Sequence, residues 1–253
     1  MAFELDFPRT AIVTGGARRI GAAITRALAS DGWDVLIHCH TSLDDAQALA
    51  REVGNARVVQ ANLAGPDPAG SIRKALADMP PPGLLVNNAS RFIHDDFDDF
   101  TVEGWNAHFD ANLKGPAFLS RMFAEMAEAG GLIVNLHDAK LENPNPDFFT
   151  YTLSKLGLAG LTELTARKLA PRAIRVCGVA PSVTLVSGPQ TRENFDAVHE
   201  MNALGRGITV EQIIAALRFI IETPTLTGQT ITLDGGQRFL RLPRDVQFMG
   251  KEE

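Results

Sequence analysis

Strand-length apolar runs and helical patterns alternate along almost the whole of this 253-residue chain, and this alternation is the feature that most limits its fold. Alternating strands and helices are typical of βαβ units, in which the strands of one sheet lie parallel and helices cover both faces. Right-handed crossovers then set the direction of winding. No repeat, low-complexity run or linker interrupts the pattern. The sequence therefore predicts a single doubly wound α/β domain over 1–253, with a mostly parallel seven-stranded sheet flanked by helices.

Two segments of the chain show no strong period. Residues 183–207 lie beside a predicted strand end, so we interpret them as a lid, and residues 237–253 form a C-terminal tail. The predicted strands are 10–14, 34–38, 57–60, the run that begins at Leu84, 131–136, 174–179 and 229–233, and the predicted helices are 22–28, 46–53, 68–77, 105–126, the stretch opening at Tyr151, and 210–221.

The composition excludes several functional classes. A net charge of −6 with scattered Lys and Arg gives no electrostatic reason to expect a nucleic-acid partner. No apolar run approaches the length that spans a membrane, and Glu4 and Asp6 stand where a signal peptide needs positive charge. Cys39 and Cys177 lie in apolar runs, which predicts small core residues rather than a disulfide or metal ligands. We therefore expect a protein of the reducing cytoplasm.

A glycine turn follows the first predicted strand and precedes a helical pattern. Gly15 permits a tight turn, and Gly21 permits close packing of the helix. The amides and the positive dipole end of a helix that begins there suit a pyrophosphate. Glycine turns also occur in many α/β proteins that bind no nucleotide, but the position of this one at the start of a βαβ chain favours a nucleotide. We expect Arg18, Arg19 and Ile20 to contact it as well.

The end of the second predicted strand carries no acidic residue. An Asp or Glu there would bind the free 2′-hydroxyl of NAD, about twenty residues beyond the glycine turn. Here the segment is His40-Thr41-Ser42, and these side chains, together with Arg18, are suited to the 2′-phosphate of NADP. The acids at 44–45 come slightly later and are expected to begin the next helix, where negative charge favours the dipole.

No metal site is predicted. The pair His38 and His40 is interpreted as two ordinary strand residues, because no third ligand is evident. The acidic segment Asp95-Asp96-Phe97-Asp98-Asp99 is interpreted as a solvated loop face.

The only tyrosine of the chain, Tyr151, stands four residues before Lys155, so the two share one face of a helix. A nearby ammonium stabilises a phenolate, and we expect Lys155 to lower the pKa of Tyr151 toward neutrality and make it a proton donor. Such a pair alone is usually an ordinary surface feature. Asp138, however, follows the end of the 131–136 run, and chemistry in open α/β sheets lies at strand ends.

The run from Leu84 ends in the polar turn Asn87-Asn88-Ala89-Ser90, followed by Phe92. This turn could brace the glycine turn and face a cofactor. Asn112 stands near the middle of the predicted 105–126 helix, where helix propensity alone would not place an amide.

Together, Thr14-Gly15 with Gly21, Asn87-Asn88-Ala89, Asn112, Tyr151-x-x-x-Lys155 and Asp234-Gly235-Gly236 resemble the short-chain dehydrogenase/reductase family over nearly the whole chain. The resemblance implies a Rossmann domain with a nicotinamide cofactor, Tyr151 as proton donor, Lys155 on the nicotinamide ribose, Asn112 in a proton relay, and a homotetramer. The residues that we assign to NADP(H) are Gly15, Arg18, Arg19, Ile20, Gly21, His40, Thr41, Ser42, Asn62, Leu63, Asn88, Ala89, Ser90, Tyr151, Lys155 and Pro181.

Two departures from the family pattern resemble the pteridine reductase subgroup. Arg19 replaces the middle glycine of the turn, and Asp138 stands where the family usually has serine. That similarity implies that Ser90 and Phe92 line a pterin site together with Asp138 and Tyr151. Thr41 departs from the subgroup, because an arginine is expected there for the 2′-phosphate.

Three functions remain open from the sequence. The first is an NADPH-dependent reductase of a dihydropteridine, such as a dihydromonapterin-like, dihydrobiopterin-like or dihydrofolate-like compound. The second is a reductase of carbonyl compounds such as oxoacyl thioesters. The third is a nicotinamide-binding sensor or scaffold with little turnover, and the intact pair of Tyr151 and Lys155 argues against it.

Overall fold

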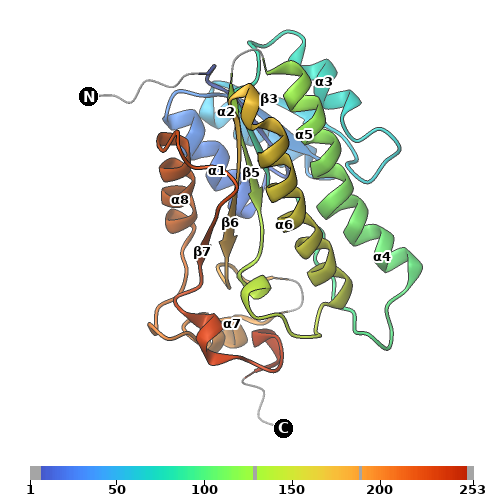
Figure 1. Cartoon of the computed structure of the whole chain (residues 1–253), viewed down its shortest axis with the longest axis vertical. Helices are drawn as coiled ribbons and strands as arrows, with labels where there is room; N and C mark the ends of the chain where they lie inside the picture. The colour runs from blue at the N-terminus through green and yellow to red at the C-terminus, as the bar shows by residue number, and fades with distance from the viewer. Residues whose placement is uncertain (1–6, 128–129, 188–189, 250–253) are drawn as a thin grey trace.

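The computed structural model describes residues 7–127, 130–187 and 190–249, which form one seven-stranded parallel sheet between two layers of helices (Figure 1). The strand order is β3-β2-β1-β4-β5-β6-β7, and every neighbouring pair is parallel. The predicted fold class is confirmed, with a sheet that is wholly rather than mostly parallel. The strands are β1 Thr10–Val13, β2 Asp34–Cys39, β3 Ala56–Gln60, β4 Leu84–Asn87, β5 Gly131–Leu136, β6 Ile174–Pro181 and β7 Thr230–Leu233.

Successive strand residues face opposite layers, which explains the two separate cores. In β1, Ala11 and Val13 pack toward α1, α2 and α8, whereas Ile12 packs toward α3, α5 and α6. Strands covered on both faces are apolar throughout, and this is why they form short continuous hydrophobic runs in the sequence. The helices are α1 Arg19–Ser30, α2 Leu43–Val53, α3 Gly70–Leu76, α4 Val102–Phe109, α5 Gly115–Met126, α6 Phe149–Leu169, α7 Arg192–His199 and α8 Val210–Glu222.

The strand order reverses direction between β1 and β4, and this creates the crevice in which open α/β sheets bind ligands. The glycine turn after β1 and the polar turn after β4 therefore become neighbours, although Thr14 and Asn88 are 74 positions apart in the sequence. Cys39 and Cys177 are free thiols buried in the core, as predicted.

Three local predictions need correction. The predicted 105–126 helix is α4 and α5 joined by a π-helical turn, Asp110–Lys114, which contains Asn112. The segment 183–207 contains a helix, α7, which lies below the sheet with the C-terminal tail (Figure 1). The acidic segment 95–99 is not wholly solvated, because Asp95 is buried and hydrogen-bonded to the start of α6.

The tail contains two short 3₁₀ helices, Gln237–Leu240 and Val246–Phe248. Three parts of the sequence discussed above lie outside the described residues: Glu4 and Asp6, residues 188–189 of the predicted lid, and residues 250–253 of the tail. Among the described residues, no helix combines the length and apolar character needed to cross a membrane. The described residues also contain no cluster of three His, Cys, Asp or Glu side chains arranged to hold a metal ion.

Candidate active site

A pocket of about 780 Å³ opens at the carboxyl ends of the strands. Its volume lies in the range of small-molecule and cofactor sites. The fold brings to it residues from the glycine turn, the turn after β4, the end of β5, α6 and the end of β6. The sequence-predicted residues that line it are Gly15, Arg18, Arg19, Ile20, Gly21, Asn88, Ala89, Ser90, Phe92, Asp138, Tyr151, Lys155 and Pro181.

The glycine turn is held tightly against the turn after β4. The Thr14 hydroxyl oxygen accepts hydrogen bonds from the amides of Asn88 and Ala89, at 2.9 and 3.0 Å, and the Asn88 side chain donates to the carbonyl oxygen of Thr14 at 2.8 Å. Gly15 has a φ of +61°, and a Cβ at Gly21 would collide with the Gly15 carbonyl oxygen. The turn therefore has no room for a side chain at these two positions, and its backbone at the start of α1 fits a pyrophosphate.

Arg19 occupies the position of the family's middle glycine with a left-handed backbone, φ 54°. That conformation costs a residue with a Cβ about 1 kcal/mol relative to glycine. Its guanidinium reaches the segment after β6, where it donates a 2.6 Å hydrogen bond to the carbonyl oxygen of Val186. Arg19 thus ties the glycine turn to the segment that we predicted as a lid.

At the other end of the glycine turn, both ring nitrogens of His38 contact backbone groups. The Gly15 amide donates to Nδ1 at 3.2 Å, and Nε2 lies 3.1 Å from the Ala61 carbonyl oxygen. Burial lowers the pKa of His38 to about 4, so the neutral imidazole is the form that holds the turn. His38 is therefore a structural brace of the glycine turn.

Of the residues predicted for the adenosine end, Arg18 lines the pocket, whereas His40, Thr41, Ser42, Asn62 and Leu63 do not. Arg18 forms an ion pair with Asp45 in the first turn of α2, so its guanidinium lies beside the N-terminus of that helix. Ser42 is the N-cap residue of α2, and its side chain makes no capping hydrogen bond. His40, Thr41 and Asn62 are exposed, and Leu63 is buried against Gly115.

The Tyr151 hydroxyl donates a 2.7 Å hydrogen bond to Oδ2 of Asp138, and the Lys155 ammonium donates to the Leu136 carbonyl oxygen, also at 2.7 Å. Tyr151 and Lys155 are buried, at 6% and 3% exposure. The strand end after β5 and the first two turns of α6 thus hold the three predicted catalytic side chains within one small volume.

The expectation that Lys155 lowers the pKa of Tyr151 is wrong for this arrangement of side chains. Burial and the adjacent Asp138 carboxylate raise the pKa of Tyr151 well above its ordinary value of 10. The Lys155 nitrogen is engaged by Leu136 and lies 5.7 Å from the centre of the tyrosine ring. Burial also raises the pKa of Asp138 and lowers the pKa of Lys155 to about 8.

Asn112 lies outside the pocket lining, in the π-helical turn. Its carboxamide oxygen accepts from the Arg91 amide at 2.7 Å, and its nitrogen donates to the Arg91 carbonyl oxygen and to Ser154 Oγ, each at 3.0 Å. A π-helical turn displaces the residues that follow it and often occurs at functional sites. Here the π-helical turn directs the Asn112 side chain toward the loop after β4. The role of Asn112 in a proton relay remains a prediction.

Phe92 packs between two aromatic rings at the edge of the pocket. Its ring stacks on Phe148 with centroids 4.3 Å apart and meets the ring of Tyr151 edge-on at 4.7 Å. The sequence left open whether Phe92 faces the substrate or packs in the loop, and its position combines the two: it is half-buried and also lines the pocket.

The C-terminal tail forms a wall of the pocket that sequence reasoning missed. Asp147, 1% exposed, accepts a hydrogen bond from Arg244 at 2.8 Å and one from the Asp245 amide at 2.6 Å. Asp245 in turn pairs with Lys140 at 3.2 Å. These contacts join residues about a hundred positions apart. The only local signal in the sequence is the acidic residue Asp147 in a Pro/Asn loop, and this signal does not predict which residue pairs with it. Arg244, Asp245, Val246 and Gln247 line the pocket as a result.

Deprotonation of Lys155 is expected to lower kcat/KM as pH rises through about 8, the pKa of this buried ammonium. Folding linkage has the opposite sign. The unfolded chain keeps this proton up to a pH of about 10.5, so the contribution of Lys155 to folding stability increases between pH 8 and 10.5. Unfolding caused by Lys155 therefore does not explain the loss of activity.

A pH–rate profile and NADPH titrations at pH 7 and 9 measure the effect. Lys155→Met should abolish the pH dependence of binding, and a wild-type profile that stays flat to pH 9.5 would contradict the prediction.

The parallel sheet, the glycine turn and the Tyr151–Lys155 pair define an oxidoreductase of the dinucleotide-binding α/β class. The profile of the short chain dehydrogenase family matches residues 9–197, and the chain belongs to this family. The family resemblance predicted from the motifs is confirmed.

Known relatives include reductases of different substrates. The chain is 40% identical to the alternative dihydrofolate reductase FolM from Brucella canis, solved with NADP, with a TM-score of 0.89 over 93% of this chain and 96% of that one. A short chain dehydrogenase from Burkholderia cenocepacia, also solved with NADP, is 31% identical, with a TM-score of 0.83 over 92% and 99%. The 3-oxoacyl-[acyl-carrier-protein] reductase of Synechocystis is 30% identical over 90% of this chain and 96% of its own length. The two NADP complexes agree with the nicotinamide cofactor expected from the sequence.

Proposed function

We propose that this protein is an NADPH-dependent reductase of a pteridine-type substrate, such as a dihydromonapterin-like, dihydrobiopterin-like or dihydrofolate-like compound. The observation that carries the proposal is the 2.7 Å hydrogen bond between Tyr151 and Asp138. In the wider family, a serine usually stands at the position of Asp138. A carboxylate accepts hydrogen bonds from the ring and amino N–H groups of a pterin. The Phe92 ring at the pocket edge adds an aromatic contact for a flat heterocycle. The 40% identity to FolM supports the same substrate class.

The proposed reaction reduces a C=N bond of the pteridine ring. NADPH held by the glycine turn and Lys155 would supply the hydride for the ring carbon. Tyr151 gives the matching proton to the ring nitrogen, and its raised pKa ensures that the hydroxyl is protonated beforehand. The charged Lys155 stabilises the phenolate that results. Asp138, whose pKa burial raises, takes up a proton from solvent and returns it to Tyr151 through their hydrogen bond.

The glycine turn and the helix start are proposed to hold the pyrophosphate, with Lys155 and Tyr151 at the nicotinamide ribose. Asn88, Ala89, Ser90 and Pro181 line the same pocket and complete the proposed cofactor site.

NADPH is expected to bind about tenfold or more tightly than NADH, because the 2′-phosphate gains charge-assisted hydrogen bonds. Arg18 lies beside the N-terminus of α2, where Ser42 has an unused side chain. Arg18→Gln should weaken NADPH binding and leave NADH binding nearly unchanged in isothermal titration. Arg26→Gln is the matched control, since Arg26 of α1 pairs with Glu52 near the C-terminal end of α2. Equal or tighter binding of NADH by the wild-type protein would refute the preference.

A carbonyl reductase is the second candidate, favoured by the 30% identity to an oxoacyl reductase. An ionised Asp138 beside Tyr151 would repel the negative charge that develops on a ketone oxygen, and this argues against it. The deciding experiment measures NADPH oxidation with dihydropterins, dihydrofolate, ketones and an oxoacyl thioester. Efficient reduction of ketones with no turnover of any dihydropterin or dihydrofolate would overturn the pteridine proposal.

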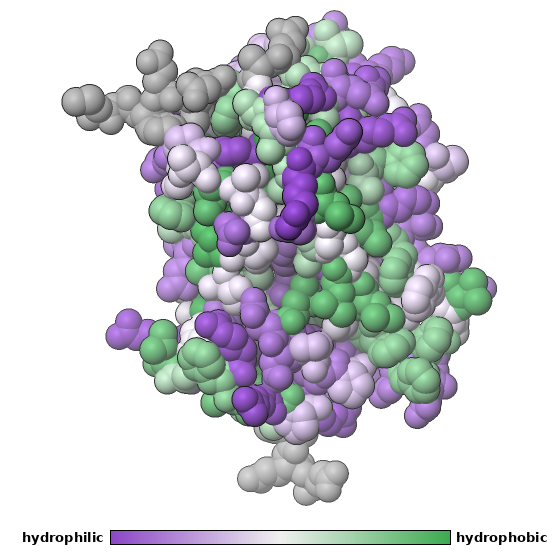
Figure 2. Space-filling model, viewed as in Figure 1, coloured by the Kyte–Doolittle hydropathy of each residue, from purple (hydrophilic) through white to green (hydrophobic). Residues whose placement is uncertain are grey.

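We also propose a homotetramer in the cytoplasm. Apolar side chains gather over α4 and the lower half of α6 (Figure 2). Phe100 just before α4, Phe118 on α5, and Leu156 and Leu164 on α6 are exposed. Exposed apolar areas of this kind mark contacts between subunits. Light scattering on the purified protein measures the assembly, and a monomeric mass would refute it.

A further inference from the structure

We propose that Asp95, Thr150 and His108 form a clamp that positions the segment 91–95 and the start of α6 around the substrate. We call these three residues the loop clamp. The inference deepens the proposed function and rests on it for the identity of the substrate. The three are positioning residues, since none of them lines the pocket.

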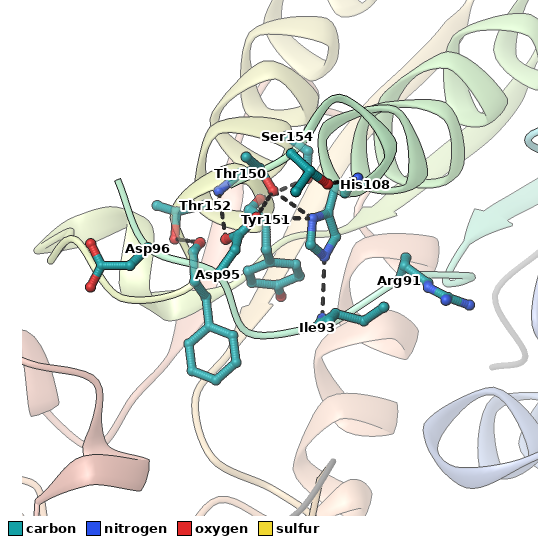
Figure 3. A network of polar contacts seen from close by, with 12 residues as sticks. Arg91, Ile93, Asp95, Asp96, His108, Thr150, Tyr151, Thr152 and Ser154 are labelled. Carbon is teal, nitrogen blue, oxygen red and sulfur yellow. Dashed lines mark hydrogen bonds and ion pairs between the residues drawn. The ribbon is translucent and has the colours of Figure 1, made fainter. Parts of the chain in front are cut away.

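The loop clamp is a continuous chain of buried hydrogen bonds (Figure 3). The Thr150 hydroxyl donates to Oδ2 of Asp95, and His108 Nδ1 lies 2.7 Å from the same hydroxyl oxygen. At its far end, His108 Nε2 accepts the amide hydrogen of Ile93 at 3.2 Å. Thr150 is 0%, His108 1% and Asp95 9% exposed, so water does not compete for these bonds.

Asp95 supplies the cap that α6 lacks. The N-cap residue is Phe148, whose side chain accepts no hydrogen bond, in a left-handed conformation of φ 54°. The Asp95 carboxylate instead accepts from the Thr150 amide at 3.0 Å, and its carbonyl oxygen accepts from the Phe149 amide at 3.2 Å. A negative charge at the first turn is favourable for a helix. The helix that carries Tyr151 is therefore anchored by the loop after β4.

The loop clamp also determines where Phe92 lies. Asn112 holds both backbone groups of Arg91, and His108 holds the amide of Ile93. Phe92 is fixed between these two points, with its ring against Phe148 and the edge of Tyr151. Loosening the segment would thus move the aromatic wall of the pocket relative to the proton donor.

The direction of the bonds requires a neutral His108. Because Nε2 accepts from Ile93, the ring proton is on Nδ1 and points to Thr150. A second proton on Nε2 would set two donors against each other. Burial and the nearby Arg91 lower the pKa of His108, while Asp95 raises it, and burial is the largest effect. The Tyr151 ring also lies near the His108 ring in an edge-to-face arrangement, with 6.1 Å between the two ring centroids.

The sign of the pH effect follows from the lowered pKa. A conformation in which the loop is open exposes His108, which then takes up a proton below about 6.5, whereas the clamped form resists it. Clamping is therefore complete above that pH and weakens as the pH falls below it. The dihydropterin KM of the wild-type protein should rise on the acid side.

Thr150→Val tests the clamp, because it keeps the shape of the side chain and removes the hydroxyl at the centre of the chain. With two hydrogen bonds lost, we expect the dihydropterin KM to rise about tenfold and the acid rise of KM to disappear. The NADPH dissociation constant should stay close to that of the wild type, whereas the melting temperature should fall by a few degrees, because two buried hydrogen bonds are lost. Thr150→Ser restores the hydroxyl and should restore the KM.

Thr165→Val is the matched control, since this threonine of α6 bonds only to carbonyl groups of its own helix. Asp95→Asn is a second probe that keeps the size of the cap and removes its charge, and it should also raise the KM. An unchanged KM and acid limb in Thr150→Val would overturn the clamp. A loss of NADPH binding as large as the rise in the dihydropterin KM would also overturn it, by showing a general disturbance of the fold.

Amide exchange separates this inference from the proposed function. The Ile93 amide, which donates to His108, should exchange faster in Thr150→Val than in Thr150→Ser or Thr165→Val, whatever substrate the protein reduces. If the wild-type protein turns over no dihydropterin, the proposed function fails while faster exchange still supports the clamp. Unchanged exchange rates would refute the clamp alone.

Discussion

Tyr151→Phe is expected to lower kcat for the best substrate by about a hundred-fold or more, the contribution that a general acid typically makes. The substitution removes only the hydroxyl that donates to Asp138 and leaves the ring in contact with Phe92. The carboxylate loses one hydrogen bond, which costs about 1 kcal/mol in stability, so the fold should persist. Steady-state kinetics with NADPH and a dihydropterin measure the effect.

Binding measurements give the control for Tyr151→Phe. NADPH titration and the melting temperature should change little, because the glycine turn, its braces and Lys155, which would hold most of the cofactor, are unchanged. A variant that binds NADPH normally and still turns over at the wild-type rate would show that the proton comes from another group.

Asp138→Ser should cut pterin reduction by about a hundred-fold, because it removes both the acceptor for pterin N–H groups and the group that returns a proton to Tyr151. The effect on ketones should be opposite. The Asp138 charge is one of the causes of the raised pKa of Tyr151, and a serine hydroxyl stabilises a developing oxyanion. Ketone reduction should therefore increase from the wild-type level.

Asp138→Asn is the control that keeps the size of the side chain and removes its charge. It should lose pterin reduction as well. If Asp138→Ser reduced dihydropterins as fast as the wild type, the carboxylate would have no part in the reaction, and the main argument for a pteridine substrate would be lost.

Local sequence signals were sufficient to place most of the proposed site. Parallel strands of a doubly wound sheet end at one edge, so residues that follow strands, such as Gly15, Asn88 and Asp138, must come close together once the strand pattern is recognised. The spacing of Tyr151 and Lys155 is a property of a single helix and needs no tertiary information.

Other features depend on residues far apart in the chain, and no local pattern encodes them. Asp95 was interpreted as solvated because its neighbours are acidic, yet it is buried as the cap of α6, 55 residues further along. The tail wall of the pocket depends on Asp147 meeting Arg244, 97 positions away. Periodicity identifies which face of an element is buried, but not which distant loop covers its end.

The sequence alone determined the fold class, the family and the types of side chain at the proposed site, because these follow from periodicity and short-range spacing. Only the tertiary structure decided the electrostatics. Lys155 follows Tyr151 by one helical turn, yet the pKa of the phenol rises, because the hydroxyl is buried against Asp138 while the ammonium is bound to Leu136. The burial of these groups, and which of Asp138 and Lys155 lies nearer to the phenol, depend on packing from several elements at once. The spacing of residues along one helix carries no information about that packing.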